Sequence, residues 1–392
     1  MHRHSIFCIL PPHILQEIIA NGSDQQRDFA QRTLFTSEQF RGQRLAMREL
    51  GNLLGLTGAP GKTRTIYDAR MGTGLPGVVV RQEGGPASSD PAVNEAYNGS
   101  GATFDLFYNI YGRNSIDDNG MALNSTVHFD KGYDNAFWNG QQMVYGDGDE
   151  DLPVAQRLFN RFTIAIDVIG HELAHGVTEH EARLDYVGQS GALNESFSDV
   201  FGSLVKQYQS QQSAASADWI IGEGLFTANV NGAGIRSMKA PGTAYNDPML
   251  GRDPQPAHMQ DYVNTSEDNG GVHINSGIPN HAFYVTAVQI GGYAWEKAGK
   301  IWYVTLRDKL SRNSNFQNAA DLTFQTAADL YGAGSPEQMA VQAGWAAVGL
   351  SVQAAEPIPV PPTPTPTPIP TPGQGCLTAV LKAIGVTLTP GR

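Results

Sequence analysis

The chain has 392 residues, a hydrophobic fraction of 41% and a formal net charge of −12. This length and composition suit a globular protein whose two lobes bury a core. The acidic balance argues against nucleic acid and anionic membrane surfaces as partners. The two cysteines, Cys8 and Cys376, lie near opposite ends, so we expect no disulfide in the middle of the chain.

Residues 1–55 are predicted to form a separate N-terminal unit. The apolar run Ile6 to Leu10 is too short for the core of a signal peptide, and Pro11-Pro12 ends it. The pattern that follows predicts a helix over residues 13–20. A second helix is expected through residue 40, with Ser23 as its N-cap.

Residues 56–163 are predicted to form a strand-rich lobe. Short apolar runs such as Val78-Val79-Val80 sit among Gly and Pro, and one helix is expected over residues 93–111. Gly61-Lys62-Thr63 is not a phosphate-binding loop, because that motif needs glycine where the chain has Leu56.

The segment His171-Glu172-Leu173-Ala174-His175 carries the strongest chemical signal. Its flanks suit a buried helix over residues 164–181, and positions i and i+4 of a helix share one face. Two imidazoles placed in this way can bind one metal ion, with Glu172 beside the first of them. This is the H-E-x-x-H pattern of zinc hydrolases, although a helix that happens to carry two histidines would also match it.

A candidate third ligand follows in the run from Gly191 to Asp199. Three protein ligands and one water make a catalytic zinc site, and we assign Glu195 as the third ligand. Asp199 lies four residues later, on the same helical face. Asp199 and Asn194 can each accept a hydrogen bond from the second N–H group of a zinc histidine.

His180 is a competing ligand. It lies nine residues after His171, about 900° around a helix, and so faces the opposite side. The metzincin pattern would need glycine at 178 and histidine at 181, where the chain has Thr178 and Glu181. We therefore expect His180 to be an exposed helix residue.

Helical patterns dominate residues 182–351. A Pro/Thr-rich linker over 352–374 is expected to be extended, and the tail over 375–392 is too short to be a domain or a membrane span. The predicted fold class is α+β, with a strand-rich N-terminal lobe and a helical C-terminal lobe. The zinc-binding helix over residues 164–181 would join the two lobes.

These motifs together resemble the thermolysin family of neutral zinc metalloproteases. The runs from Asn135 to Gly140, from Met143 to Asp149 and from Asp268 to Gly277 match the family in the same order, over roughly residues 65–350. The Ile-Leu-Pro-Pro-His-Ile-Leu stretch is similar to the short prosegment of the protealysin-like members. The resemblance implies the two-lobed family fold and a zymogen whose propeptide inhibits it, with processing between residues 43 and 65.

The resemblance also implies catalytic roles. Glu172 is the expected general base that activates a zinc-bound water. His273, oriented by Asp268, and Tyr186 are expected to stabilise the oxyanion. Taken alone, Tyr186 would also fit a packed surface aromatic residue.

Substrate binding is expected from two groups of residues. Backbone and carbonyl contacts are assigned to Asn135, Ala136, Trp138 and Arg236, with the substrate bound as an added strand. An apolar pocket for the residue after the cleaved bond is assigned to Phe159, Val168, Ile221 and Ile235. We therefore expect cleavage before Leu, Phe, Ile or Val. Arg236 could otherwise be a solvated charge, and the four apolar residues ordinary core.

The double calcium site of the family is predicted to be absent. Asp167, Asp218 and Glu223 match its carboxylates, but Lys206 and Ile220 stand where two further carboxylates should be. The Lys206 ammonium would replace the charge of one cation in an ion-pair cluster. One catalytic zinc ion is therefore the expected cofactor.

Cys8 has two interpretations. Its thiolate could block the zinc ion, or it could be a small buried apolar residue, and we favour the second.

The predicted activity is that of a zinc endopeptidase acting on protein or peptide substrates. A monomer with no nucleic-acid partner and no membrane span is expected. The family is commonly extracellular, which favours secretion, and a cytoplasmic location is the alternative because no signal peptide is visible. Two other functions stay open: a peptide-binding homologue that does not cleave, and a zinc aminopeptidase, which would need acidic residues to hold a free amine.

Overall fold

The computed structural model describes residues 7–37 and 61–352. The chain divides into two units after Ala354, and all of the described residues belong to the first unit. Four predictions lie wholly or largely outside the described residues: the linker over 352–374, the tail over 375–392, the end of the second propeptide helix and the processing region. No helix in the described part of the chain is long and apolar enough to cross a membrane.

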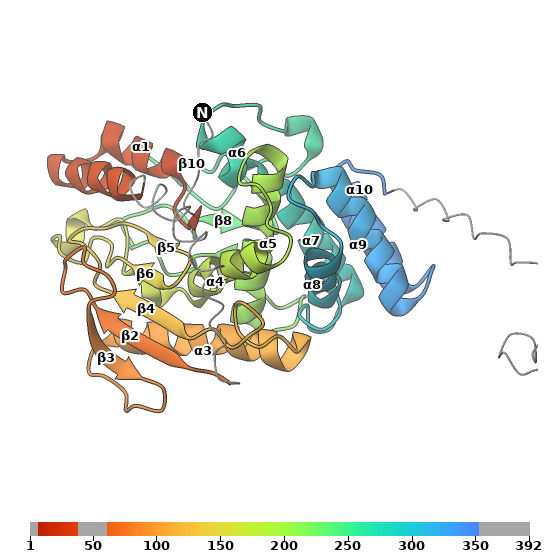
Figure 1. The fold of residues 1–392 in the computed structure, drawn as a ribbon. Helices are drawn as coiled ribbons and strands as arrows, with labels where there is room; N and C mark the ends of the chain where they lie inside the picture. Colours follow the sequence, from red (N-terminus) through yellow and green to blue (C-terminus); the bar gives the residue numbers. More distant parts are fainter. Residues whose placement is uncertain (1–6, 38–60, 353–392) are drawn as a thin grey trace, which may run out of the picture. The chain divides into compact units, whose positions relative to one another are not determined.

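A six-stranded mixed sheet forms the N-terminal lobe (Figure 1). Its strand order is β1-β5-β6-β4-β2-β3, with parallel pairing of β4 to β2 and to β6 and antiparallel pairing elsewhere. The first strand comes from the predicted propeptide and pairs with β5, so this N-terminal segment extends the sheet of the strand-rich lobe. The strands are β1 (Phe7–Cys8), β2 (Arg64–Asp68), β3 (Val78–Gln82), β4 (Leu123–Val127), β5 (Ala136–Trp138) and β6 (Met143–Tyr145).

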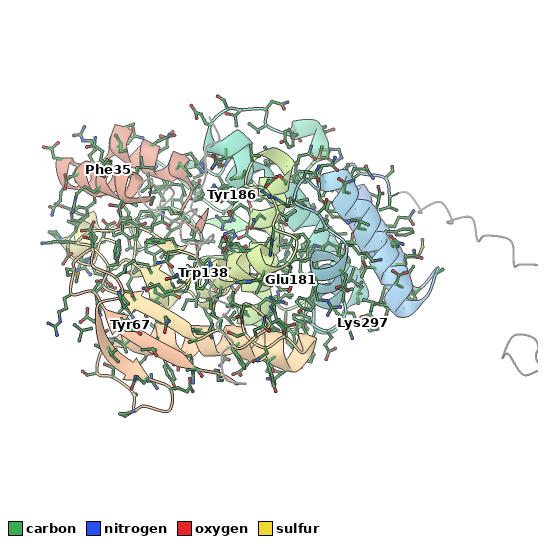
Figure 2. All side chains as sticks on the ribbon, in the orientation of Figure 1. Phe35, Tyr67, Trp138, Glu181, Tyr186 and Lys297 are labelled. Atoms are coloured by element: carbon green, nitrogen blue, oxygen red, sulfur yellow. The ribbon has the colours of Figure 1, made fainter. Side chains whose placement is uncertain are left out.

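Helices make up most of the C-terminal lobe, with two small antiparallel ribbons. The ribbons are β7 (Ile220–Ile221) with β8 (Arg236–Ser237), and β9 (Asn246–Asp247) with β10 (Gly251–Arg252). The helices of this lobe are α5 (Gly188–Ser210), η3 (Met259–Asp261), α6 (Asp268–Asn275), α7 (Gly277–Ile290), α8 (Ala298–Asp308), α9 (Phe316–Tyr331) and α10 (Pro336–Ala347). The strand-rich and helical lobes confirm the predicted fold class, and side chains fill the space between sheet and helices (Figure 2).

The two N-terminal helices begin close to their predicted starts, the first of them one residue earlier than residue 13. Pro12 opens α1 (Pro12–Asn21), because a proline has no N–H to lose in the first turn. A second helix covers residues 24–37 of the described chain. Ser23 Oγ accepts a bond from the Gln26 amide at 3.4 Å, and Gln26 Oε1 accepts one from the Ser23 amide at 2.8 Å. This reciprocal pair is a capping box.

Between the lobes lies α4 (Ile166–His180), the helix expected over residues 164–181. Ile164 belongs instead to a short 3-10 turn, η2 (Phe162–Ile164), and another such turn, η1, covers Val154–Gln156. The long helix of the first lobe, α3 (Pro91–Tyr111), begins two residues before the predicted start. Asp90 caps it by accepting a bond from the Ala92 amide at 2.9 Å.

Helices α4 and α5 approach each other closely at two glycines. A Cβ atom on Gly202 would lie 2.4 Å from the carbonyl oxygen of Asp167, and one on Gly170 would lie 3.1 Å from the Cα of Gly202. A side chain at Gly202 would clash with the backbone of α4, and one at Gly170 would be tightly packed, so this spacing favours glycine at both positions. The contact brings the His171 face of α4 against the Asp199 face of α5.

Candidate active site

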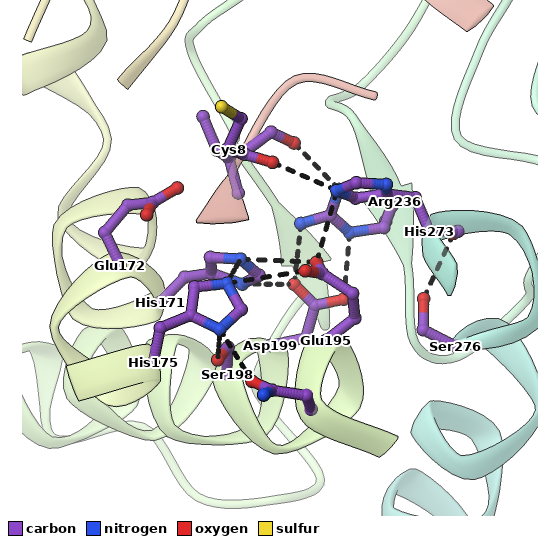
Figure 3. Close-up of polar contacts among 12 residues, drawn as sticks. Cys8, His171, Glu172, His175, Glu195, Ser198, Asp199, Arg236, His273 and Ser276 are labelled. Carbon is purple, nitrogen blue, oxygen red and sulfur yellow. Dashed lines mark hydrogen bonds and ion pairs between the residues drawn. The ribbon is translucent and has the colours of Figure 1, made fainter. Parts of the chain in front are cut away.

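Two imidazoles on α4 form the centre of the site (Figure 3). The Nδ1 atom of His171 lies 2.8 Å from Asp199 Oδ1, which can only accept. The Nδ1 atom of His175 lies 2.8 Å from Asn194 Oδ1, whose orientation follows because Asn194 Nδ2 donates to the Leu184 carbonyl. These acceptors hold the proton on Nδ1 of each ring and leave a lone pair on each Nε2.

The two lone pairs converge on one point. The Nε2 atoms of His171 and His175 are 3.0 Å apart, and the Glu195 carboxylate lies 3.5 Å from the first and 3.4 Å from the second. His171, His175 and Glu172 also offer ligand atoms within 4.8 Å of one another. Lone pairs and a carboxylate buried so close together need a cation between them, and nitrogen and oxygen donors of this kind fit zinc.

Asp199 connects the imidazole of His171 to further donors. It accepts 2.8 Å bonds from Nε and Nη2 of Arg236 and from Nδ2 of Asn280. Burial opposes its ionisation, but Arg236 and His171 hold the pKa of Asp199 well below its ordinary value. The carboxylate is therefore charged and fixed in orientation, which in turn fixes the ring of His171.

Two neighbours of the metal histidines were missed from the sequence. Ser198 Oγ lies 2.8 Å from His175 Nδ1, and Asn280 binds Asp199. The spacing of Ser198, three residues after Glu195 on one helical face, could have revealed it. Asn280 is 81 positions from its partner in sequence, and no local pattern points to it.

Glu172 lies between the metal histidines and the sheet. It is fully buried, and its Oε2 accepts a 3.0 Å bond from the backbone N–H of Trp138 on β5. The indole of Trp138 donates to Glu179 at 3.2 Å, about two turns further along α4. Glu172, the general base predicted from the sequence, is thus oriented by strand β5 of the N-terminal lobe.

His273 is held by a tight turn of the backbone. Asp268, Asn269, Gly270 and Gly271 all have positive φ, between 48° and 88°, just before His273. This turn lets Asp268 accept from the His273 amide at 2.8 Å and contact its Nδ1 at 2.6 Å. Burial opposes the charged ring, but Asp268 and Glu195 raise the pKa of His273 to about 9.

Tyr186 comes from the segment before α5 and meets the same group of side chains. Its hydroxyl donates to Glu195 Oε1 and lies 3.2 Å from His273 Nε2. The structure therefore brings together the predicted oxyanion donors, Tyr186 and His273, beside the predicted third ligand.

The propeptide backbone contacts four of the predicted site residues. Leu10 N donates to Asn135 Oδ1 at 3.0 Å, and Ile9 N donates to the Ala136 carbonyl at 3.3 Å. Arg236 Nη1 donates to the Ile9 carbonyl at 3.0 Å, and His273 Nε2 lies 3.1 Å from the Cys8 carbonyl. The propeptide thus lies where a bound peptide was expected.

The four residues assigned to the apolar pocket, Phe159, Val168, Ile221 and Ile235, are all buried. Ile221 and Ile235 lie beside Arg236, since Ile221 pairs with Arg236 and the Ile235 amide donates to the Ile221 carbonyl at 2.8 Å. Their role as a pocket wall stays a prediction.

Cys8 matches the interpretation that we favoured. Its side chain is buried in an apolar cluster with Phe129, Tyr133, Phe137 and Val144. In Figure 3 its sulfur points away from His171 and His175. The Cys8 backbone, rather than its thiol, faces the site.

Lys206 occupies a second polar cluster on the same pair of helices. Its ammonium lies 2.8 Å from Asp218, 3.2 Å from Asp167 and 3.5 Å from Glu223. It also donates to the Ile220 carbonyl at 2.9 Å. Burial opposes its charge, but Asp167 and Asp218 raise the pKa of Lys206. This is the ion-pair cluster expected from the sequence. His180, as also expected, is exposed.

Comparison with known families covers almost all of the described chain. Residues 52–179 match the model of the thermolysin metallopeptidase catalytic domain, and residues 182–350 match that of its alpha-helical domain. Residues 8–35 match the protealysin propeptide.

Individual relatives agree with these matches. An extracellular metalloprotease of Pectobacterium carotovorum is 51% identical over 90% of this chain and 99% of its own length. A thermolysin of Alicyclobacillus acidocaldarius is 41% identical over 72% of this chain and 50% of its own length. Among solved structures, the precursor of protealysin from Serratia proteamaculans is 52% identical with a TM-score of 0.79, covering 88% of this chain and all of its own.

Proposed function

The chain belongs to the thermolysin family of zinc metalloendopeptidases and carries a protealysin-type propeptide. From this membership we propose a role for each residue of the site. His171, His175 and Glu195 hold the zinc ion, and Asp199 and Asn194 orient the two imidazoles. When bound, zinc lowers the pKa of a water molecule and polarises the scissile carbonyl.

Glu172 takes the proton of the attacking water and later passes it to the leaving amine. Its buried carboxylate, oriented by the Trp138 amide, supports this role. His273 and Tyr186 stabilise the oxygen on which charge develops, and Asp268 keeps His273 charged and in place. The 2.6 Å contact between the His273 ring and Asp268 supports this assignment.

Substrates bind as an added strand along β5. The contacts of the propeptide backbone give this proposal its strongest support. Asn135, Ala136, Arg236 and His273 each contact the backbone of propeptide residues 8–10, at the end of the strand β1 that is added to that edge and just after it. Main-chain contacts of this kind bind peptides of many sequences. Preference then comes from the apolar pocket of Phe159, Val168, Ile221 and Ile235, which favours cleavage before Leu, Phe, Ile or Val.

The propeptide (residues 1–55) is an intramolecular inhibitor, and its removal between residues 43 and 65 releases the active form. We propose that the two lobes of this form, residues 56–163 and 182–351, are joined by the helix over 164–181. The mature protein acts as a monomer outside the cell, which is supported by the extracellular relatives. The Lys206 cluster replaces the family's double calcium site.

Digestion of casein by the processed protein tests the function. We expect activity that a zinc chelator removes and that zinc restores. Glu172→Ala should abolish activity while zinc content stays unchanged, whereas Glu179→Ala, about two turns further along the same helix, should keep most of it. A processed protein that holds zinc but cuts no peptide would favour the non-cleaving homologue. Release of single N-terminal residues would favour the aminopeptidase.

A further inference from the structure

Propeptide residues 7–10 lie in the register of a bound peptide. Phe7 pairs with Trp138 and Cys8 with Phe137, antiparallel, at the free edge of β5. The Ile9 and Leu10 amides continue the ladder to the Ala136 carbonyl at 3.3 Å and to Asn135 Oδ1 at 3.0 Å. The contacts therefore involve consecutive residues, and they fix the register to a single residue.

Two consecutive carbonyl groups of this strand meet two different side chains. The Cys8 carbonyl lies 3.1 Å from His273 Nε2, and the Ile9 carbonyl accepts from Arg236 at 3.0 Å. Under the proposed function, His273 stabilises the oxygen of the carbonyl that is attacked, and Arg236 binds a substrate carbonyl, which in this strand belongs to the next residue, Ile9. This register puts the Cys8–Ile9 bond at the position of cleavage.

The side chains on either side of this bond agree with that register. Ile9 is 0% exposed and is one of the apolar types expected after the cleaved bond. Cys8 points into the apolar cluster of Phe129 and Phe137, so its thiol leaves the metal side of the strand clear. Glu172 accepts a hydrogen bond from the Trp138 amide, and Trp138 pairs with Phe7. The Glu172 carboxylate therefore lies next to the propeptide strand.

We propose that the zymogen hydrolyses its own Cys8–Ile9 bond while the propeptide stays docked. The proposal rests on the proposed function. The oxygen of water adds to the Cys8 carbonyl carbon as Glu172 takes the proton. The C–N bond then breaks, its electron pair stays on the Ile9 nitrogen, and that nitrogen takes the proton from Glu172. The products are a carboxyl group on Cys8 and an amine on Ile9, with no other reactant.

The new amine remains at the site after the cut. Arg236 still binds the Ile9 carbonyl, and Asn135 still binds the Leu10 amide. Helix α1 anchors the segment further, because Ile14, Leu15 and Ile18 are buried and His13 Nε2 lies 2.8 Å from the Tyr245 hydroxyl. A tethered amine has a high effective concentration, so re-formation of the bond competes with release. The propeptide can thus be a substrate and still inhibit.

Intact-mass analysis of the full-length, zinc-loaded chain tests this inference after rapid acid quenching. We expect a fragment that begins at Ile9, in a fraction that becomes constant with time while the propeptide is still docked. Ile9→Val should keep the cut, Ile9→Asp should reduce it at least about tenfold because a carboxylate does not suit a buried apolar position, and Glu172→Ala should abolish it. If the processed chain digests casein but the Cys8–Ile9 bond stays whole in the zymogen, the inference fails and the proposed function stands. If the processed chain digests nothing, both fail.

A second measurement does not depend on activity. In the Glu172→Ala chain, where nothing can be cut, the amides of Ile9 and Leu10 should exchange slowly with deuterium, because both are bonded in the docked strand. Adding Ile9→Asp should speed their exchange, and adding Ile9→Val should leave it slow. Fast exchange at both amides in Glu172→Ala itself would overturn the docked register.

Discussion

Helices α4 and α5 contribute residues to two polar clusters, and these clusters acquire positive charge in different ways. In the metal cluster, His171, His175 and Glu195 converge, and the charged ring of His273 lies beside this group, 3.7 Å from Glu195. In the lysine cluster, Lys206 is itself the cation among Asp167, Asp218 and Glu223. The first is incomplete without a metal ion, and the second is complete from the sequence alone. Buried carboxylates therefore do not identify a metal site until every nearby positive group has been counted.

The largest expected effect comes from neutralising the carboxylate of the metal cluster. Glu195→Gln should remove zinc from the purified protein and reduce casein hydrolysis by about 10³-fold, since bound zinc contributes several kcal/mol to the transition state. Zinc content by atomic emission and initial rates measure this. Glu223→Gln, a carboxylate of the lysine cluster, is the matched control and should keep its zinc. Full zinc content in Glu195→Gln would contradict the assignment of the third ligand.

A change at the helix contact should affect both clusters together. Gly202→Ala places a Cβ atom 2.4 Å from the Asp167 carbonyl oxygen, a backbone atom that cannot move without shifting α4. We expect a loss of about 3 kcal/mol in the free energy of unfolding, measured by urea denaturation. Gly74→Ala, where a Cβ would meet nothing within 4 Å, should change stability by less than about 0.5 kcal/mol. Equal stability of the two variants would show that the close approach is not needed.

Replacing Lys206 removes the positive charge from the lysine cluster, which should then need a bound cation as the metal cluster does. Lys206→Met leaves Asp167 buried without its partner and should lower the free energy of unfolding by about 2 kcal/mol. The loss should be smaller than for a fully buried ion pair, because the Glu223 side chain is 60% exposed. Lys206→Glu should instead create calcium-dependent stability, with a melting temperature that rises on adding calcium. The unchanged chain should show no such rise. If the melting temperature of Lys206→Glu were the same with and without calcium, the proposed replacement of calcium by lysine would be contradicted.

The smallest expected effect concerns a third cluster, in which a bound proton gives His128 its positive charge. His128 lies 2.7 Å from Asp90 and 2.8 Å from Asp147, and hydrogen bonding to Asp147, against the effect of burial, raises its pKa to about 9. A raised pKa means that the folded state binds the proton more tightly than the unfolded state. The stabilisation is therefore complete below about pH 6.5 and is lost as the pH rises through about 9.

We expect about 1 kcal/mol of unfolding free energy to disappear over that range, a value reduced for the partial solvent exposure of the ring. Urea denaturation of the chain at pH 6 and at pH 10 measures it. His128→Gln cannot bind the proton and should show a smaller change between the two pH values. The same pH dependence in both proteins would remove His128 as its cause.

Much of the site was predictable because its signals are local. The i, i+4 spacing of His171 and His175 follows from helical geometry, and so does the position of Asp199 one turn after Glu195. The N-cap at Ser23 was predictable for the same reason, since caps depend on neighbouring residues, whereas α1 begins at Pro12, one residue before its predicted start. The start of α3 was placed two residues late because Asp90-Pro91 was not recognised as a cap followed by proline at the first helical position.

Other features depend on residues far apart in the chain, which no local pattern connects. The bond from Asn280 to Asp199 spans 81 positions, and the one from Arg236 to Ile9 spans 227. The register of the propeptide strand is of this kind, because a shift by one residue would place a different bond beside His273 while the sequence pattern stays the same.

The amino-acid sequence by itself determined the family, the metal histidines and the charge that Lys206 brings, and it predicted the base, because each depends on residue type and short spacing. Only the tertiary structure decided which carboxylates surround Lys206, that Cys8 presents its carbonyl rather than its thiol, and which bond of the propeptide faces the site. Those outcomes result from the packing of α4 against α5 and of β1 against β5, where contacts between distant segments fix positions to within one residue.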